Sequence, residues 1–421
     1  MESDGGKSAV SEEDAPRVGS VWRKHVPGQG RKGTDMTQET TGKPYSRADR
    51  EALATTACSE LMLYGLWDHK TRVKQCIKKY FLRRQTAPED LVFWPTGLLA
   101  AGLWEYRQAL SGGCDQAAAG RADDREPAAR RETILQIDQA LGAYYTRWMK
   151  KGCPVCYLDD LLAGETLLSA YAAYAESGKD NGIVGAQNAD VCQAAIGKLA
   201  DYGMTYPTDE MGSFPYRAAQ NNGYVFVDAI GLACPFLYRY GVVYHNTGVM
   251  ELAVKQVVNF VAYGMDGATG LPYHGYVMND AYKYGVIGWG RAVGWLLRGM
   301  AGCMITEYGA ERLSDSYIRL VDAVLPYQHK EGYFSWQLQA MDGPVDTSAT
   351  GMICAALKQG IGLHILTEPE YEHALQIGTN AICRSVREGR VYDCSGECEG
   401  FGQYPQRYGA YPWALGPALM L

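Results

Sequence analysis

The chain has 421 residues, of which 47% are hydrophobic, so it can bury a large core and is long enough for one to three domains. Its formal net charge of −7 argues against a nucleic-acid partner, which needs a dominant basic face. No apolar stretch approaches the roughly 20 residues that a membrane span needs, so no membrane partner is expected.

Residues 1–48 are predicted to be a disordered N-terminal segment, because they are charged, glycine-rich and poor in apolar side chains. They include no apolar run of the kind found in a secretory signal peptide, which predicts a cytoplasmic protein. Residues 49–421 are predicted to form a single catalytic domain.

Apolar residues recur with helical spacing from Leu53 to the end of the chain. The predicted helices are 51–66, 70–83, 94–110, 131–149, 159–177, 190–203, 226–241, 247–263, 289–307, 313–328, 346–363, 368–385 and 412–421. The first is interpreted as an additional helix, and the other twelve form six pairs. Residues 111–130 are expected to be a polar surface loop.

One loop-to-helix junction recurs about every sixty residues, which is typical of repeated supersecondary units. The junctions begin at Trp94, Asp159, Asp228, Trp289, Asp346 and Trp413, and each is followed by a glycine: Gly97, Gly164, Gly231, Gly294, Gly351 and Gly416. The repeat predicts an all-α fold, an (α/α)6 toroid of six helical hairpins. The active-site cleft is expected at the end where the junctions meet, because the long, aromatic connections lead into them.

Carboxylates and aromatic rings gather at these junctions, and sugar chemistry needs both: an acid held protonated and flat rings that stack on sugar faces. An Asp at a helix start is most often an N-cap, which is our interpretation of Asp346. Asp228 lies among apolar residues and departs from this expectation. Arg291 has no acid one helical turn away and is expected to bind a ligand carboxylate in preference to forming a structural ion pair. His274 either contacts a ligand or braces its loop.

The chain has twelve cysteines, most of them within apolar helical runs where a free thiol behaves as a small hydrophobe. Two pairs, Cys153 with Cys156 and Cys394 with Cys398, have spacings that a metal or a disulfide can use. Neither pair has the second motif of a zinc finger, so a structural or incidental role is expected.

Several motifs follow one another from about residue 90 to the C-terminus. They are Leu158-Asp159 with Gly164, Phe214-Pro-Tyr-Arg217 before Phe226-Val-Asp228, Tyr273-His274-Gly275, Trp289-Gly-Arg-Ala-Val-Gly-Trp295, Asp346-Thr-Ser-Ala-Thr-Gly-Met352, and Tyr408 to Trp413. In this order they resemble the unsaturated glucuronyl and unsaturated rhamnogalacturonyl hydrolases, glycoside hydrolase families 88 and 105. The motif from Trp289 to Trp295 is the most specific match.

The resemblance implies that a 4,5-unsaturated uronic acid is released from the non-reducing end of lyase-generated oligosaccharides by hydration of its vinyl ether. It implies catalytic roles for Asp228 and Asp159, an oligosaccharide partner, and neither metal nor cofactor. The implied substrate-binding residues are Asp160, Tyr216, Arg217, His274, Trp289, Arg291, Trp295, Ser348, Trp94 and Trp336. A monomer or homodimer is expected.

Two departures from the family pattern bear on the linked sugar: Phe226 replaces a Trp, and Tyr216-Arg217 replaces the His-Lys of the rhamnogalacturonyl enzymes. A rhamnogalacturonyl substrate derived from pectin is favoured. The alternatives are an inverting glycosidase or a sugar epimerase on the same toroid, or a toroid that binds carbohydrate without catalysis, because a fold does not fix a function.

Removal of residues 1–45 should leave both the melting temperature and the activity nearly unchanged, because this segment has no apolar periodicity with which to join a core. Thermal denaturation of the full-length and shortened chains compares the two. A large drop in melting temperature would mean that the segment packs on the domain.

Overall fold

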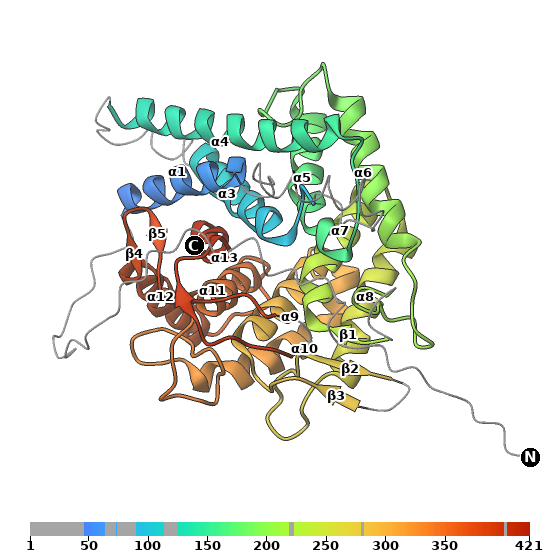
Figure 1. The fold of residues 1–421 in the computed structure, drawn as a ribbon, viewed down its shortest axis with the longest axis vertical. Coiled ribbons are helices and arrows are strands. Elements are labelled where there is room, and N and C mark those ends of the chain that lie inside the picture. The colour runs from blue at the N-terminus through green and yellow to red at the C-terminus, as the bar shows by residue number, and fades with distance from the viewer. Residues whose placement is uncertain are drawn as a thin grey trace, which may run out of the picture.

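The computed structural model describes residues 46–63, 73, 90–112, 125–218, 223–278, 282–399 and 402–421, and the α-helices in these ranges form two concentric layers (Figure 1). The inner layer is α3 (Trp94–Gly112), α5 (Leu161–Ser177), α7 (Val227–Val243), α9 (Gly290–Cys303), α11 (Thr347–Gly362) and α13 (Pro412–Met420). The outer layer is α1 (Arg47–Leu63), α4 (Arg125–Lys150), α6 (Ala189–Met204), α8 (Thr247–Tyr263), α10 (Glu307–Val324) and α12 (Pro369–Arg384). Two short 3-10 helices, η5 (Leu158–Asp160) and η6 (Leu325–Tyr327), precede α5 and follow α10.

The inner layer is a closed ring, because each inner helix packs on the next one along the chain and α13 packs on α3. The all-α toroid expected from the sequence is therefore confirmed. None of the described helices is both long and apolar enough to cross a lipid bilayer.

The junction glycines lie where neighbouring inner helices touch. A Cβ atom added to any of them would lie within 2.3 to 3.0 Å of an atom of the adjacent inner helix. The contacts are Gly97 with Leu162, Gly164 with Phe236, Gly231 with Trp295, Gly294 with Met352, Gly351 with Pro417 and Gly416 with Leu98. The repeated glycine is thus needed for the close approach of the inner helices.

The sixth outer position belongs to α1, which packs against α3, α4 and α13. From the sequence, this helix was predicted to lie outside the six pairs, and a helix at 70–83 was predicted for the outer layer. Residues 70–83 lie outside the described residues apart from residue 73. The proposed disordered segment also lies outside them up to residue 45.

Several helix boundaries differ from those predicted, among them the following three. Helix α4 begins at Arg125, inside the stretch expected to be a polar loop. Helix α9 ends at Cys303 and α10 begins at Glu307, because Thr306 is extended (φ −136°) and interrupts an apolar pattern that continues through it. Local periodicity does not detect such a break.

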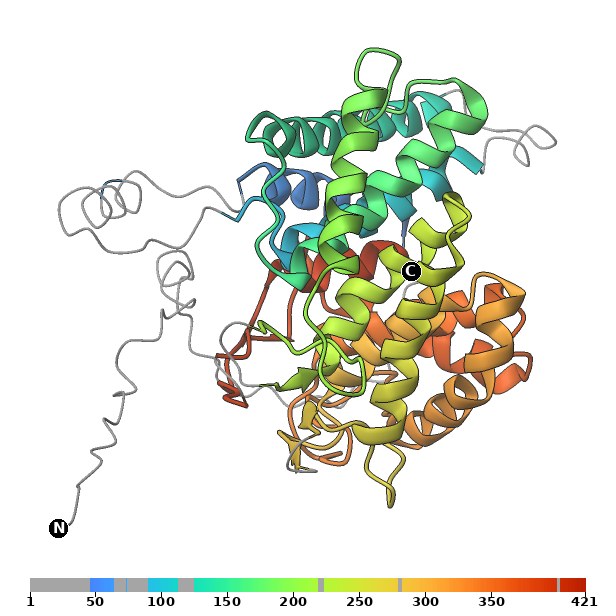
Figure 2. The same cartoon turned by 90° about the vertical axis from the view of Figure 1, so that its right-hand side faces the viewer.

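Short strands, absent from the sequence prediction, form in the long connections. They are β1 (Val225–Phe226), β2 (Gly275–Val277), β3 (Tyr282–Tyr284), β4 (Val386–Arg387), β5 (Arg390–Val391), β6 (Cys394–Ser395) and β7 (Tyr408–Gly409). All pairs are antiparallel: β1 with β2, β2 with β3, β4 with β5, and β6 with β7. The segments before α7 and before α13 lie on the same side of the helical ring (Figure 2).

Candidate active site

The pairing of β1 with β2 brings Asp228 and His274 together. Phe226 is opposite Gly275 in this pair, and the amide of Val227 donates to the carbonyl of His274 over 2.9 Å. The His274 Nε2 atom then lies 2.9 Å from Asp228 Oδ2. Asp228 stands in the first turn of α7, but its side chain does not cap the helix. Its carboxylate is therefore available for another task.

Exposure separates Asp228 from the other aspartates at the starts of the inner helices. Its side chain is 20% exposed, compared with 1% for Asp159 and 0% for Asp346, and Asp160 is also fully buried. The residues on either side of Asp228 are buried and apolar. Asp228 thus combines apolar surroundings with access to the surface, which a general acid that meets a ligand requires.

The other nitrogen of His274 faces the C-terminal loop. Its Nδ1 atom lies 2.6 Å from the hydroxyl oxygen of Tyr404. The imidazole is held between Phe226 and Trp289, whose ring centroids lie 4.6 and 4.8 Å away. His274 therefore links the C-terminal loop to the carboxyl group of Asp228. Of its two expected roles, ligand contact and loop bracing, these protein contacts support bracing.

Asp159 belongs to a second cluster beside the first. The hydroxyl of Tyr216 donates to Asp159 Oδ2 over 2.8 Å, and Arg217 Nη2 lies 3.5 Å from the same oxygen. Oδ1 is buried without a hydrogen-bond partner among the described residues. Burial raises the pKa of Asp159; Arg217 and Tyr216 oppose the shift, and the charge of Asp228 adds to it. The two carboxyl groups are thus close enough to interact electrostatically.

Arg217 is the cation of this second cluster. Its backbone is left-handed (φ 54°), a conformation uncommon for a residue other than glycine. Its guanidinium carbon lies 4.1 Å from the ring centroid of Tyr157, and its side chain is 14% exposed. Arg217 is therefore held by an aromatic ring and keeps a small part of its side chain exposed.

Asp160 faces away from this cluster and pairs with Asp90. Asp160 Oδ2 accepts hydrogen bonds from the amides of Cys156 and Tyr157 at 2.6 and 3.2 Å, and its carboxyl group shares a side-chain hydrogen bond with Asp90. Burial and the charge of Asp159 raise the pKa of Asp90 to about 6, and burial and the charge of Asp90 raise the pKa of Asp160 well above its usual range. The pair therefore retains a proton, and a substrate-binding role for Asp160 is not supported.

Arg291 is committed to protein partners. It is 3% exposed, its Nη1 atom lies 3.7 Å from Asp346 Oδ2, and Nη2 donates to the carbonyl of Gly396 over 2.8 Å. Nη1 also bonds the carbonyl and hydroxyl of Ser395. The sequence prediction assumed that Arg291 has no acidic partner, because none lies on its own helix. Asp346 at the start of α11 is that partner, so the expected ligand-binding role is not supported.

Asp346 organises the same network and is the N-cap that the sequence predicts. Its Oδ1 atom accepts from the amide and hydroxyl of Ser348 at 2.9 and 2.6 Å, and Oδ2 accepts from the hydroxyl of Ser395 at 2.6 Å. Ser348 is fully buried between Asp346 and Arg291. Ser348 therefore braces the helix start, and its expected contact with substrate is not supported.

The predicted tryptophans separate into two groups. Trp94, Trp295 and Trp413 pack at the centre of the ring, with Trp94 5.3 Å from Trp413 and 6.0 Å from Trp295 between centroids. Trp336 and Trp289 flank Tyr404, with centroids 5.4 and 5.3 Å from its ring. Trp289 and Trp295 are buried, so of the four predicted sugar-stacking rings only Trp94 and Trp336 keep exposed surface.

Four polar residues of the site region were not predicted: Asp90, Ser395, Glu397 and Tyr404. Burial raises the pKa of Glu397 to about 7, against the opposing charges of Arg291 and Arg217. Three of the four lie in the long aromatic connection before α13, so the length of that loop was a signal for the region. It was no signal for the individual residues.

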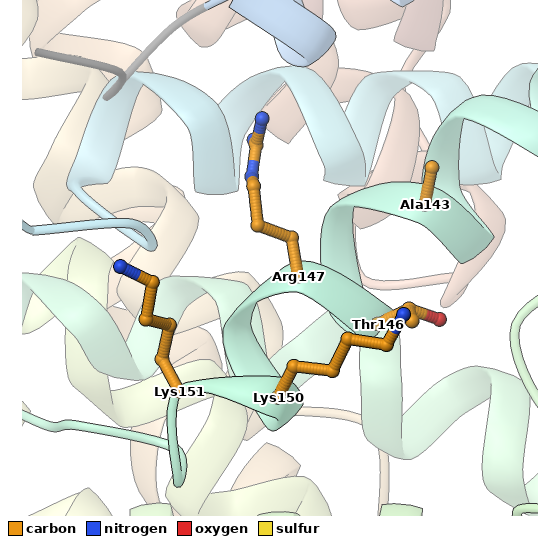
Figure 3. A pocket seen from close by; sticks show the side chains of 5 residues that line it. All are labelled: Ala143, Thr146, Arg147, Lys150 and Lys151. Carbon is orange, nitrogen blue, oxygen red and sulfur yellow. The ribbon is translucent and has the colours of Figure 1, made fainter.

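Other features of the described residues are separate from this site. A hollow of about 450 Å³ is lined by Ala143, Thr146, Arg147 and Lys150 of α4 and by Lys151, which follows this helix (Figure 3). It has three cations and no acid among these lining residues, so it offers no acid–base pair. The described cysteines are free thiols, and no described group of three or more His, Cys, Asp or Glu side chains is arranged to hold a metal ion.

Comparison with known proteins supports the sequence resemblance. Residues 129–421 match the family model described as Glycosyl Hydrolase Family 88. No curated protein matches the chain in sequence.

Solved structures share its fold. A possible member of the GH105 family from Klebsiella pneumoniae subsp. pneumoniae MGH 78578 is similar over 93% of this chain and 97% of its own (TM-score 0.66, 15% identity). The unsaturated glucuronyl hydrolase from Bacillus sp. GL1 is similar over 89% of this chain and 95% of its own (TM-score 0.57, 15% identity). At such identities the likeness concerns the fold.

Arg291→Lys should lower the free energy of unfolding by about 2 kcal/mol, because an ammonium group cannot reproduce the forked contacts to Ser395 and Gly396. Urea denaturation measures this change, and the KM for substrate is determined on the same variant. A stable variant whose KM rises more than about tenfold would return the ligand-binding role to Arg291.

Asp160→Asn should stabilise the protein at pH 8 and have little effect near pH 4. The raised pKa values mean that the folded state holds more protons than the unfolded state, so the pair lowers stability as pH rises from about 4 through 6 and above. The amide removes one charge and keeps an oxygen for the two backbone amides. Melting temperatures between pH 4 and 8 test this; a variant destabilised equally at every pH would contradict it.

Proposed function

The chain belongs to glycosyl hydrolase family 88, and we propose that it releases a 4,5-unsaturated uronic acid from the non-reducing end of an oligosaccharide by hydrating its vinyl ether. The observation that supports this proposal most directly is the state of Asp228. Among the aspartates at the starts of the inner helices it is the one with exposed side-chain surface, and a histidine nitrogen lies 2.9 Å from one of its oxygens.

The reaction begins with protonation of C4 by the carboxyl group of Asp228, and positive charge develops at C5 and the ring oxygen. Water adds to C5 and returns a proton to the carboxylate of Asp228, which restores the acid. The resulting hemiketal opens to a ketone at C5, and the hemiacetal at C1 then expels the remaining oligosaccharide and becomes an aldehyde. One group that first donates and then accepts a proton is sufficient for this sequence.

The burial of Asp159 favours this reaction over ordinary glycoside hydrolysis. Hydrolysis normally uses two carboxyl groups that flank the scissile bond, one of which must reach a water or the sugar. Asp159 is 1% exposed, and its Oδ2 atom is occupied by Tyr216 and Arg217. We assign Asp159 to orienting Tyr216 and Arg217.

Arg217 is our candidate for the uronate carboxylate of the substrate. Its cation–π contact with Tyr157 fixes the guanidinium group, and its Nη2 atom lies 3.5 Å from Asp159 Oδ2. Arg291, the alternative, is buried against Asp346. A guanidinium group also offers the planar, two-pronged donors that match a carboxylate.

For the linked sugar we propose rhamnose, as in fragments of the pectin component rhamnogalacturonan. Two partly exposed rings, Tyr224 and Tyr284, lie 5.4 Å apart between centroids, and Tyr284 is 6.0 Å from Phe226, which packs on His274. Such surfaces suit the methyl group of a deoxysugar. A sulfated glycosaminoglycan fragment would need further cations for its sulfates.

A panel of unsaturated disaccharides tests the reaction and the linked sugar together. Hydration removes the ultraviolet absorbance of the conjugated double bond, so the rate of its loss is compared for rhamnogalacturonan, chondroitin and heparin fragments. Turnover of the corresponding saturated disaccharides would instead favour an ordinary glycosidase.

Asp228→Asn should retain the fold and lower kcat by a factor on the order of 10³ or more, because the amide cannot donate the required proton. The matched control is Asp201→Asn, an exposed aspartate on α6, which should keep full activity. If the Asp228 variant retained a tenth of the activity, the acid would have to be another residue, with Asp159 the first to examine.

A further inference from the structure

The hydroxyl group of Tyr404 is built into the site. Tyr404 lies between the paired strands β6 and β7, and β6 is anchored by the bonds of Ser395 to Asp346 and Arg291. Opposite Tyr404 stands Gly285 (φ +84°), where an added Cβ would lie 2.6 Å from the Tyr404 hydroxyl and 2.5 Å from His274 Cβ. A larger residue at this position would separate the two, so the approach of Tyr404 to His274 depends on the glycine.

The distances form a chain from the loop to the acid. Tyr404 Oη lies 2.6 Å from His274 Nδ1, and His274 Nε2 lies 2.9 Å from Asp228 Oδ2. Burial raises the pKa of Tyr404, so its hydroxyl keeps its proton and can donate it in a hydrogen bond. Donation to Nδ1 selects the neutral tautomer in which Nε2 carries the hydrogen.

This tautomer determines where the acidic proton of Asp228 can lie. When Nε2 donates to Oδ2, that oxygen is an acceptor, and the acidic proton must be on Oδ1. In the opposite tautomer Nε2 is an acceptor and would draw the proton onto Oδ2, toward the histidine and away from the sugar. The choice between the two is made at Nδ1, which Tyr404 contacts.

We propose that Tyr404 is a positioning residue that fixes the Nε2–H tautomer of His274 and thereby keeps the acidic proton of Asp228 on Oδ1. This inference rests on the proposed function, in which Asp228 protonates C4. The proton leaves Oδ1 for C4, the Nε2–H bond of His274 steadies the carboxylate that forms, and the added water returns a proton to Oδ1. His274 and Tyr404 gain and lose no proton over the cycle.

A simpler role for Tyr404 would be packing, because its ring touches Trp289 and Trp336. Tyr404→Phe separates the two roles, since it keeps the ring and removes the hydroxyl. The matched control is Tyr408→Phe on β7, whose hydroxyl bonds Gln406 at the exposed edge of the same loop. Both variants are the full chain with a single oxygen removed.

The first readout needs no substrate. The nitrogen-15 spectrum of histidine-labelled protein distinguishes the Nε2–H and Nδ1–H tautomers, and the His274 signals are identified by their absence from a His274→Gln variant. We expect Nε2–H in the wild type and in the Tyr408 variant, and a mixture of tautomers in Tyr404→Phe. An Nδ1–H tautomer in the wild type, or an unchanged spectrum in Tyr404→Phe, would overturn the proposal.

The second readout is the pH profile of kcat on an unsaturated disaccharide. Tyr404→Phe should lower kcat about tenfold or more and change the shape of the profile, while KM stays within about twofold. Equal kcat and profile in the variant and wild type would also overturn the proposal. If the wild type turned over no unsaturated disaccharide, the proposed function would fail and with it the role of the Asp228 proton. The spectra would then separately report whether Tyr404 sets the tautomer.

Discussion

The close approach of the inner helices is the constraint on which the site depends. Six glycines, one for each inner helix, remove the side chain at the point of contact, where even a Cβ would lie within 3.0 Å of the neighbouring helix. Because these glycines follow the junctions at a similar spacing, the contacts between helices also align the helix starts. Asp159, Asp228, Arg291 and Asp346 therefore meet at one end of the ring, although they come from four separate units. A ring with wider helix spacing would leave them too far apart to interact.

Most of the charges gathered in this way are used to hold the structure. A buried charge is costly unless it is paired and hydrogen-bonded, and Asp346 with Arg291 meets this requirement through Ser348, Ser395 and Gly396. Asp159 is paired with Tyr216 and Arg217, and Asp160 shares a hydrogen bond with Asp90. Asp228 differs from Asp159, Asp160 and Asp346 because its side chain is 20% exposed and its Oδ2 atom is hydrogen-bonded to His274. Asp159, Asp160, Asp228 and Asp346 are the same residue type at similar places in the repeat. Burial and bonding partners therefore distinguish the structural carboxylates from the candidate acid.

The C-terminal loop completes the arrangement. Strand β6 is fixed to the start of α11 by Ser395, and Trp413 at the start of α13 donates to the carbonyl of Ser395 over 3.0 Å. The same loop carries Tyr404 to His274, and Glu397 into the field of Arg217 and Arg291. The Arg291–Asp346 network thus affects Asp228 indirectly, because it fixes the loop whose Tyr404 contacts His274.

The sequence by itself determined the repeat, most of the helices, the (α/α)6 ring and the family, because helical periodicity, junction glycines and motif order are local signals. It also predicted Asp346 as an N-cap from its neighbouring residues, and the family resemblance made Asp228 the candidate for the acid. Only the tertiary structure decided which side chains become partners. His274 and Tyr404 are 130 residues apart, Arg291 and Ser395 are 104 apart, and the register of two-residue strands that joins such positions is too short to leave a periodic pattern. The burial of Ser348, the ion pair of Arg291 and the place of α1 in the ring follow from the packing of helices distant in sequence. Local residue patterns carry no information about such packing, because the partner of a buried charge is chosen by proximity in the folded state.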